Sequence, residues 1–165
     1  MLIGVIADTH GDLGRAERCL ALLPKVEIIL HAGDLYEDGQ RIAEATGMRV
    51  VGVRGNCDYM VKGPTEEMLA VAGKRIYITH GHLYKVKRDL GILTQRSLML
   101  GADVTVFGHT HAADITKRDG ILFVNPGSPH SPRSGAPSCA VLDVSRKGVK
   151  DRIYYLKPEP TRVTP

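Results

Sequence analysis

The chain has 165 residues, of which 43% are hydrophobic and 24% charged, and its formal net charge at neutral pH is +4. This length suits a single domain that buries its own core and needs no disulfide staples. No apolar run approaches the roughly 18 residues that a membrane span requires. Two Phe, no Trp and scattered basic residues do not make a nucleic-acid platform. We therefore expect no membrane association and no dedicated nucleic-acid partner.

The amino terminus and the cysteines indicate the cellular compartment in which the protein is expected. The stretch Met1–Ala7 has no basic start and is followed directly by Asp8, unlike a secretion signal. The three cysteines, Cys19, Cys57 and Cys139, are widely spaced and form no C-x-x-C pair, which argues against a disulfide framework. Both features favour a reducing cytoplasm.

Apolar runs alternate with helical patterns in the first half of the chain. Leu13, Ala16 and Leu20 recur at helical spacing, and Pro24 follows the end of that pattern. The alternation predicts β-α-β-α-β order with parallel strands. In chain order we expect a strand at Leu2–Ala7, a helix at Leu13–Leu23, a strand at Val26–Ala32, a helix at Gln40–Thr46 and a strand at Arg49–Val53.

The second half is typical of hairpins. Gly73-Lys74 and Asp119-Gly120 predict tight turns, the second of type I′. The expected pairs are Met68–Ala72 with Arg75–Thr79, Ile115–Arg118 with Ile121–Val124, and Cys139–Val144 with Val149–Leu156, with a helix at Leu90–Leu100 and a strand at Val104–Phe107 between the first two pairs. The stretch Asn125–Pro137 has the composition of a binding loop. We assign residues 1–157 to one domain and 158–165 to a Pro-containing tail.

Five polar fragments follow the apolar runs. They are Asp8-Thr9-His10, Gly33-Asp34, Gly55-Asn56-Cys57-Asp58, His80-Gly81-His82 and Gly108-His109-Thr110-His111. Residues two apart in an extended chain point to the same side, about 6.6 Å apart, and a carboxylate can bridge two cations. Such mixed oxygen and nitrogen donors suit Mn, Fe, Zn or Ni. Alone, each fragment has an ordinary alternative as a turn, a cap or an isolated histidine. Together they predict a two-metal hydrolytic centre.

In this order the fragments resemble the motifs of the calcineurin-like metallophosphoesterases, and most closely the small bacterial and archaeal phosphodiesterases of the YfcE type. The match runs from Asp8 to about Arg133. It implies an α/β fold, a four-layer α/β/β/α sandwich with the metals at its strand ends. It also implies hydrolysis of a small phosphodiester by a hydroxide held between two divalent ions about 3.5–4 Å apart. Manganese is the favoured metal, with nickel, iron and zinc as alternatives, and a homodimer is expected.

The resemblance also implies roles for individual residues. It gives one ion to Asp8, His10, Asp34 and His111, and the other to Asp34, Asn56, His80 and His109, so that Asp34 is the bridge. These seven residues would be catalytic through the metal-bound hydroxide. Asn56, Cys57, His82 and Arg133 are expected to contact the substrate, and the Asn125–Pro137 loop to contact substrate or to support the site without binding metal. His31 is either a core residue or a partner of a ligand.

Cys57 departs from the pattern of the broader superfamily, which commonly has Gly-Asn-His-Asp/Glu with a histidine that assists the leaving group. A thiol with a reference pKa near 8.5 is a poor acid for protonating an alkoxide. We therefore expect a preference for phosphodiesters or activated esters. Two alternatives remain: a phosphomonoesterase or nucleotidase with the same centre, and a non-catalytic protein-binding scaffold like the retromer subunit Vps29. A scaffold should lack ligands, and no implied ligand position is substituted here.

Overall fold

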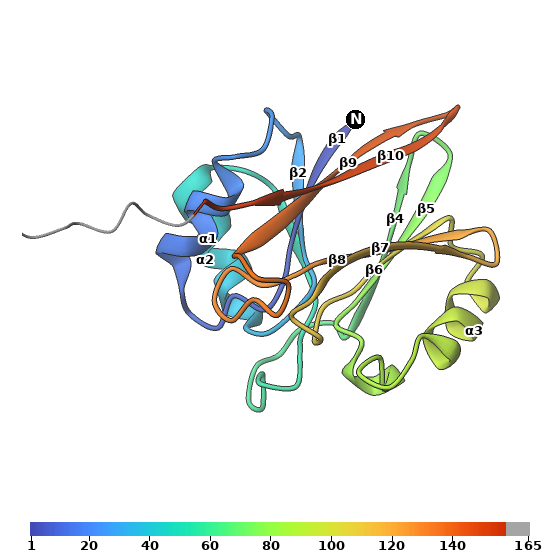
Figure 1. Cartoon of the computed structure of the whole chain (residues 1–165), viewed down its shortest axis with the longest axis horizontal. Helices are drawn as coiled ribbons and strands as arrows, with labels where there is room; N and C mark the ends of the chain where they lie inside the picture. Colours follow the sequence, from blue (N-terminus) through green and yellow to red (C-terminus); the bar gives the residue numbers. More distant parts are fainter. Residues whose placement is uncertain (158–165) are drawn as a thin grey trace, which may run out of the picture.

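The computed structural model describes residues 1–157, which form two five-stranded β-sheets with helices outside both (Figure 1). The first sheet has the strand order β10-β9-β1-β2-β3 and the second the order β4-β5-β6-β8-β7. The first sheet and its helices comprise β1 (Leu2–Ile6), α1 (Leu13–Leu20), β2 (Ile28–His31), α2 (Tyr36–Thr46), β3 (Val50–Gly52), β9 (Ser138–Ser145) and β10 (Gly148–Tyr155). The second comprises β4 (Glu66–Val71), β5 (Lys74–Thr79), a 3₁₀ turn η1 (His82–Tyr84), α3 (Gly91–Met99), β6 (Val104–Val106), β7 (Ala113–Arg118) and β8 (Ile121–Pro126). The tail predicted at 158–165 lies outside the described residues.

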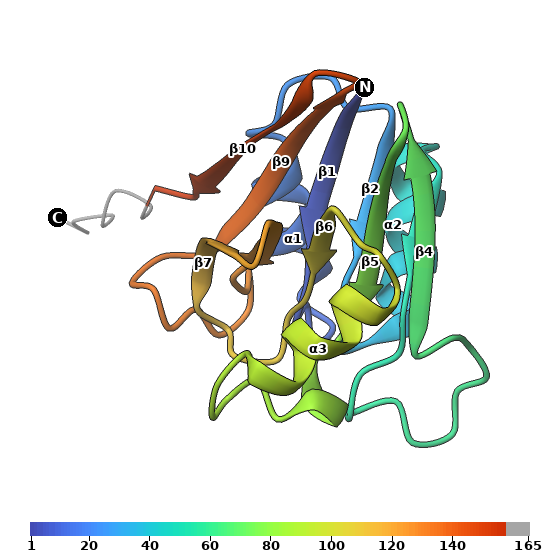
Figure 2. The same cartoon turned by 90° about the vertical axis from the view of Figure 1, so that its right-hand side faces the viewer.

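Alternating side chains divide the interior into layers. In β1, Ile3 and Val5 belong to the core between the two sheets, whereas Ile6 packs with Ala16 of α1 and Ile42 of α2. This is the period of two that a strand covered on both faces requires. The second sheet is built in the same way and packs its outer face under α3 (Figure 2). The predicted four-layer α/β/β/α sandwich is confirmed.

The predicted hairpins form, with one change of register. Asp119 and Gly120 have φ of 50° and 83°, the two positive values of a type I′ turn. In the β4–β5 hairpin, however, the turn residues are Ala72 and Gly73, with φ of 49° and 79°, and Lys74 already pairs with Val71. The turn therefore lies one residue earlier than the Gly-Lys pair indicated, because alanine accepts the left-handed position here.

Two helix boundaries differ from the prediction. α2 begins at Tyr36 and not at Gln40, and its first turn carries Glu37 and Asp38, whose charges favour a helix amino terminus. α1 ends at Leu20 and not at Leu23, because the chain tightens into i to i+3 hydrogen bonds beyond it. No helix within residues 1–157 is both long and apolar enough to cross a membrane.

The topology fixes where the polar fragments lie. β1, β2 and β3 are mutually parallel, and so are β5, β6 and β8. The carboxyl ends within each set therefore share one edge, and hydrogen bonds between the two sheets at that edge join residues that follow β1 to residues that follow β5 and β6. The five fragments thus meet at one end of the sandwich.

Candidate metal centre

Six of the predicted ligands converge at this end of the sandwich: Asp8, His10, Asp34, His80, His109 and His111. The Nε2 atom of His80 lies 3.1 Å from Asp8 Oδ1 and 3.5 Å from Asp34 Oδ2. Donor atoms lie within 4.8 Å of one another in three overlapping groups: Asp8 with His10 and His111, Asp34 with His80 and His109, and His10 with Asp34 and Cys57. Residues far apart in the sequence therefore form one cluster of oxygen and nitrogen donors, with three side chains from each sheet.

The backbone at this cluster adopts conformations that non-glycine residues rarely take. Asp8, His10, Asp34, His109 and His111 all have positive φ, between 43° and 69°. Each follows the end of a strand, so the left-handed conformation turns the chain sharply and directs the side chain to the sheet edge. Strained backbone of this kind concentrates at functional sites, where the surrounding structure maintains it.

Two glycines allow the fragments to approach one another. A Cβ atom on Gly33, whose φ is +96°, would lie 2.7 Å from Cδ2 of the His80 ring. A Cβ atom on Gly55 would overlap the carboxylate of Asp34. Both positions therefore require glycine, because a larger residue would displace a side chain of the cluster.

The charges of the cluster suit a cation. Asp8 and His80 are fully buried, and Asp34 is 2% exposed. Burial works against ionisation of Asp34, but the charge of His80 and two hydrogen bonds from Cys57 together lower the pKa of its carboxyl. Burial lowers the pKa of His10, and it lowers that of His109 to about 4. Carboxylate and neutral imidazole are the forms in which these groups bind metals.

A buried network supports the turn between Asp8 and His10. The Thr9 hydroxyl donates to Asp38 Oδ2 at 2.7 Å, and the Gly11 N–H donates to the same oxygen at 2.7 Å. His31 Nε2 lies 3.0 Å from the Thr9 hydroxyl. His31 is therefore a partner of this turn. Asp38 was not predicted, and its only signal is an acidic residue at the start of a helix.

The protonation state of His31 predicts how the free energy of unfolding depends on pH. Burial lowers its pKa to about 4, although Asp38 opposes the shift, and neutral Nδ1 accepts a hydrogen bond from the Gly33 N–H. The unfolded chain binds this proton near pH 6.5, so the stability that neutral His31 contributes is complete above that pH and is lost as the pH falls toward 4. Between pH 7 and about pH 4.5 the wild type should lose about 2–3 kcal/mol more unfolding free energy than His31→Gln. Urea denaturation of both metal-free proteins measures this, and equal losses would contradict it.

Cys57 and His82 lie against the cluster, and their contact with substrate stays a prediction. The backbone N–H of Cys57 donates to Asp34 Oδ1 at 3.0 Å, and its thiol donates to Oδ2 at 3.3 Å. Burial and the charge of Asp34 raise the pKa of this thiol to about 11, so it stays protonated at neutral pH. Nδ1 of His82 lies 3.0 Å from Nδ1 of His80, and the His82 ring is 6.1 Å from that of His109.

Asn56 and Arg133 lie further out. The Asn56 side chain is exposed, and its Nδ2 is 3.5 Å from the Cys57 sulfur, so the structure places it at the solvent side of the cluster. Arg133 reaches the site through its backbone N–H, which donates to the His111 carbonyl at 2.8 Å, while its side chain is exposed. Asp58 is buried and accepts hydrogen bonds from the N–H groups of Tyr36 and Gly55, so it forms the turn.

The loop between β8 and β9 supports the cluster from one side. The Ser128 hydroxyl donates to the Asp8 carbonyl at 2.7 Å, and the Ser131 carbonyl lies 3.1 Å from Nδ1 of His111. The His130 ring lies 5.6 Å from the ring of His10. Sequence reasoning missed His130, whose only signal is its place in a loop of binding-site composition.

The comparisons with known proteins agree with this geometry. The sequence model of the calcineurin-like phosphoesterase superfamily domain matches residues 1–147. A probable metallophosphoesterase of Methanothermobacter thermautotrophicus is 38% identical over 149 residues, covering 87% of this chain and 86% of that protein. Phosphodiesterase YfcE of Escherichia coli K12 is 31% identical, covering 83% and 84% respectively. The crystal structure of a conserved Streptococcus pneumoniae protein, described as a predicted phosphoesterase, aligns with a TM-score of 0.75 at 25% identity, covering 93% of this chain and 97% of that one.

The fold is also shared with Vps29. Wild-type Vps29 of Entamoeba histolytica, solved in complex with zinc, aligns with a TM-score of 0.73 at 22% identity, covering 94% of this chain and 99% of that one. This likeness concerns the fold alone. The family match covers most of the chain, and it includes all six side chains that converge at the sheet edge. The chain therefore belongs to the calcineurin-like phosphoesterase superfamily and is, as such, a phosphoric ester hydrolase.

Proposed function

We propose that the chain is a metal-dependent phosphodiesterase whose cluster holds two divalent ions bridged by Asp34. The observation that carries the proposal is the position of this carboxylate between two sets of donors. Its Oδ2 lies 3.5 Å from His80 Nε2 and 3.9 Å from His10 Nε2. Asp34 thus belongs to two of the three donor groups, as a bridging ligand must.

The residues present fit two ions of the predicted kind. Asp8 and Asp34 are buried carboxylates that accept hydrogen bonds from the His109 N–H and from Cys57 and lie beside imidazoles, and buried charge of this sign is stabilised by a cation. Asp8, His10, Asp34 and His111 would hold one ion, and Asp34, His80, His109 and Asn56 the other. When bound, the two ions would lower the pKa of a water molecule and neutralise phosphoryl oxygens. Manganese is the proposed metal, with nickel, iron and zinc as alternatives.

The proposed preference for diesters rests on Cys57. Its thiol has a pKa of about 11 and donates a hydrogen bond to Asp34, so it is a weak proton donor to substrate at neutral pH. An alkyl monoester has a poor leaving group that gains most from protonation, whereas an aryl diester gains little. Position 57 therefore supplies no matched acid to the leaving group.

A comparison of substrates tests this function. Manganese-loaded protein should hydrolyse an aryl diester with a kcat/KM at least about tenfold above that for the aryl monoester, a difference of about 1.4 kcal/mol in the barrier. A preference for the monoester would instead indicate a phosphatase or nucleotidase. If metal-loaded protein hydrolyses neither ester, a binding scaffold of the Vps29 kind would be indicated.

The number of bound ions is a separate prediction. Protein purified in Mn²⁺ should contain two ions per chain, because the donor groups linked by Asp34 and His10 offer two adjacent positions. Elemental analysis against protein concentration measures this directly. A single ion per chain at saturation would contradict the bridging arrangement. The homodimer and the cytoplasmic location stay predictions.

A further inference from the structure

His82 follows β5 and lies against His80, one of the predicted ligands of the candidate metal centre. The two ring centroids are 5.0 Å apart, and the two Nδ1 atoms are 3.0 Å apart. At this distance the two nitrogens form a hydrogen bond, in which one ring donates its proton and the other accepts. The position of the proton on one ring therefore fixes the role of the other ring.

The orientation of the His80 ring decides which histidine donates. His80 is fully buried, and its second nitrogen, Nε2, lies 3.1 Å from Asp8 Oδ1 and 3.5 Å from Asp34 Oδ2. Nε2 is thus the nitrogen that faces the donor cluster, and it must be unprotonated to bind an ion. A neutral imidazole then carries its proton on Nδ1. His82 Nδ1 is therefore the acceptor.

His111 shows the same arrangement with an acceptor of a different kind. Its Nε2 lies 3.5 Å from Asp8 Oδ1, and its Nδ1 lies 3.1 Å from the Ser131 carbonyl oxygen. A carbonyl can only accept, so His111 Nδ1 donates and Nε2 is left for a metal. Histidines that bind metals commonly donate their second ring N–H to such a partner, which orients the ring and fixes its tautomer. His82 thus stands to His80 as the Ser131 carbonyl stands to His111.

The turn that carries His82 is anchored to the second sheet by hydrogen bonds. η1 begins at His82, and the Tyr84 N–H donates to the Gly81 carbonyl at 3.0 Å. The Tyr84 hydroxyl donates to the Glu66 carboxylate on β4. Arg96 of α3 donates to the other oxygen of the same carboxylate at 2.7 Å. These contacts hold the turn from outside the donor cluster.

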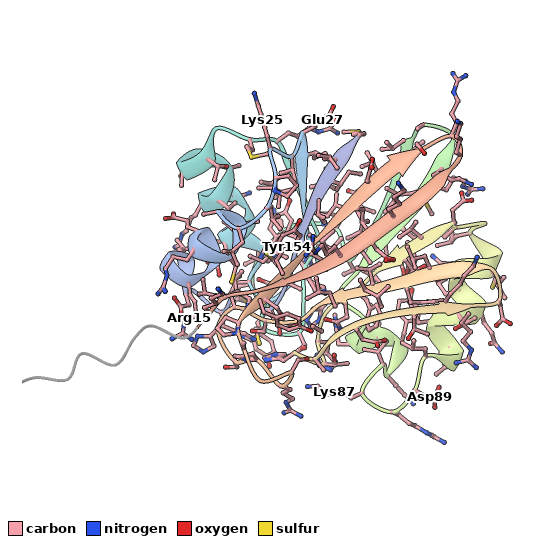
Figure 3. All side chains as sticks on the ribbon, turned by 45° about the horizontal axis from the view of Figure 1, so that its top comes forward. Arg15, Lys25, Glu27, Lys87, Asp89 and Tyr154 are labelled. Carbon is pink, nitrogen blue, oxygen red and sulfur yellow. The ribbon has the colours of Figure 1, made fainter. Side chains whose placement is uncertain are left out.

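Packing fixes the far end of the same turn. Val86 is buried in one apolar cluster with Phe107. A Cβ atom on Gly81, whose φ is +96°, would lie 2.9 Å from a methyl group of Val86, so this close approach requires glycine. Figure 3 shows Lys87 and Asp89, both exposed, on the green loop that continues from the turn. The structure therefore sets the position of the His82 ring before a metal or a substrate binds.

We propose that His82 is a positioning residue for His80. Its Nδ1 accepts the proton of His80 Nδ1 and so holds the His80 ring with Nε2 free for an ion. This role rests on the proposed function, because it concerns a ligand of the proposed two-ion centre. It differs from the substrate contact expected for His82, because it acts when no substrate is present.

The first experiment measures metal binding without substrate. Mn²⁺ is titrated calorimetrically into metal-free wild type, His82→Leu and His82→Asn. Leucine fills the space without an acceptor, whereas asparagine carries an oxygen bonded to Cγ, as Nδ1 is in histidine. His82→Leu should bind one of the two ions about 10–100-fold more weakly, the usual loss when the partner of a metal ligand is removed. His82→Asn should recover part of this affinity.

Leu83→Ala is the control for this titration, because Leu83 is exposed in the same turn and should be dispensable for metal binding. Wild-type affinity in His82→Leu overturns the proposal. An equal loss in His82→Leu and His82→Asn also overturns it, because the accepting atom would then be irrelevant. So does an equal loss in Leu83→Ala, which would report disturbance of the turn. Thermal unfolding of the metal-free proteins checks that each variant is folded.

The second experiment locates the proton in wild type and needs no variant. Isotope-labelled protein is loaded with Zn²⁺, which is diamagnetic, and the histidine ring nitrogens are observed by NMR. We expect the proton on His80 Nδ1 and a scalar coupling across the hydrogen bond to His82 Nδ1. A proton on His82 Nδ1, or no coupling between the two nitrogens, overturns the proposal.

Hydrolysis assays separate this proposal from the proposed function. If His82 only contacts substrate, His82→Leu raises KM for the aryl diester while its affinity for Mn²⁺ stays that of wild type, which overturns the positioning role. Wild type that binds Mn²⁺ and hydrolyses neither aryl ester would defeat the proposed function, and calorimetry would still decide the role of His82. Wild type that binds no ion would defeat both.

Discussion

Replacement of Asp34 by asparagine is expected to abolish tight binding of both ions and to lower aryl diester hydrolysis by more than about 10²-fold. The Asp34 carboxylate is 2% exposed and lies between His80 and His10, at 3.5 Å and 3.9 Å from their Nε2 atoms. Loss of a residue that only supports a metal ligand typically costs 10–100-fold in affinity or activity. Loss of a ligand that two ions share should therefore lower affinity and activity further, because the asparagine amide removes negative charge from both ions.

The measurement is metal content after dialysis, followed by kcat at saturating Mn²⁺. Asp119→Asn is the matched control, because Asp119 is exposed in the turn that follows the other end of β7 and the same charge is removed away from the cluster. Thermal unfolding of the metal-free proteins checks that Asp34→Asn is folded. Two tightly held ions with full turnover in the Asp34 variant would falsify the bridging role.

Replacement of Cys57 by histidine is expected to raise kcat/KM for an alkyl phosphomonoester relative to the aryl diester by about 10²-fold or more, within the 10²–10⁴-fold range of general acid catalysis. Position 57 faces the cluster, since both the N–H and the thiol of Cys57 contact the Asp34 carboxylate. The thiol holds its proton to a pKa of about 11, whereas an imidazole near its reference pKa of about 6.5 exchanges protons readily at neutral pH. The gain should therefore be largest where the leaving group is poorest.

Two further variants serve as controls for Cys57→His. Cys57→Ser keeps a hydrogen-bond donor to Asp34 and should be tolerated, and Cys57→Gln adds bulk without an acid. Metal content is measured in each, because a new histidine next to Asp34 could also capture an ion. No relative gain on the alkyl monoester in folded, fully metallated Cys57→His would show that position 57 does not reach the leaving group. The account of substrate preference would then fail even if the two-metal centre stands.

The sequence predicted the fold and the main cluster because strands and ligands carry strong local patterns. The strand ends at Asp8, Asp34 and His80 follow apolar runs, and parallel topology brings such ends to one edge within each sheet. The assignment of these residues to a shared centre between the two sheets came from the resemblance to the family. Turn chemistry placed the Asp119-Gly120 hairpin correctly for the same local reason. The strands and the turn needed no knowledge of long-range contacts.

The supporting residues could not be predicted, because their role exists only in three dimensions. Asp38 resembles any acidic residue at a helix start, yet its carboxylate holds the Thr9 turn between two ligands. His130 reaches the ring of His10 only because the loop returns to the first sheet through Ser128. The predicted start of α2 at Gln40 was wrong, because the first turn of the helix begins at Tyr36 and carries acidic residues in place of an apolar pattern.

The position of β1 has a consequence for the order in which the site can form during synthesis. β1 is the first strand made, and it pairs with β2 on one side and with β9, at residues 138–145, on the other. Asp8 and His10 therefore follow a strand that stays unpaired along one edge until nearly the whole chain has left the ribosome. Because domains complete their folding as the chain emerges, the histidines from the second sheet are already synthesised by then. Pairing of β9 completes the strand that leads to the first ligands, so a nascent chain stalled before β9 should lack the assembled cluster.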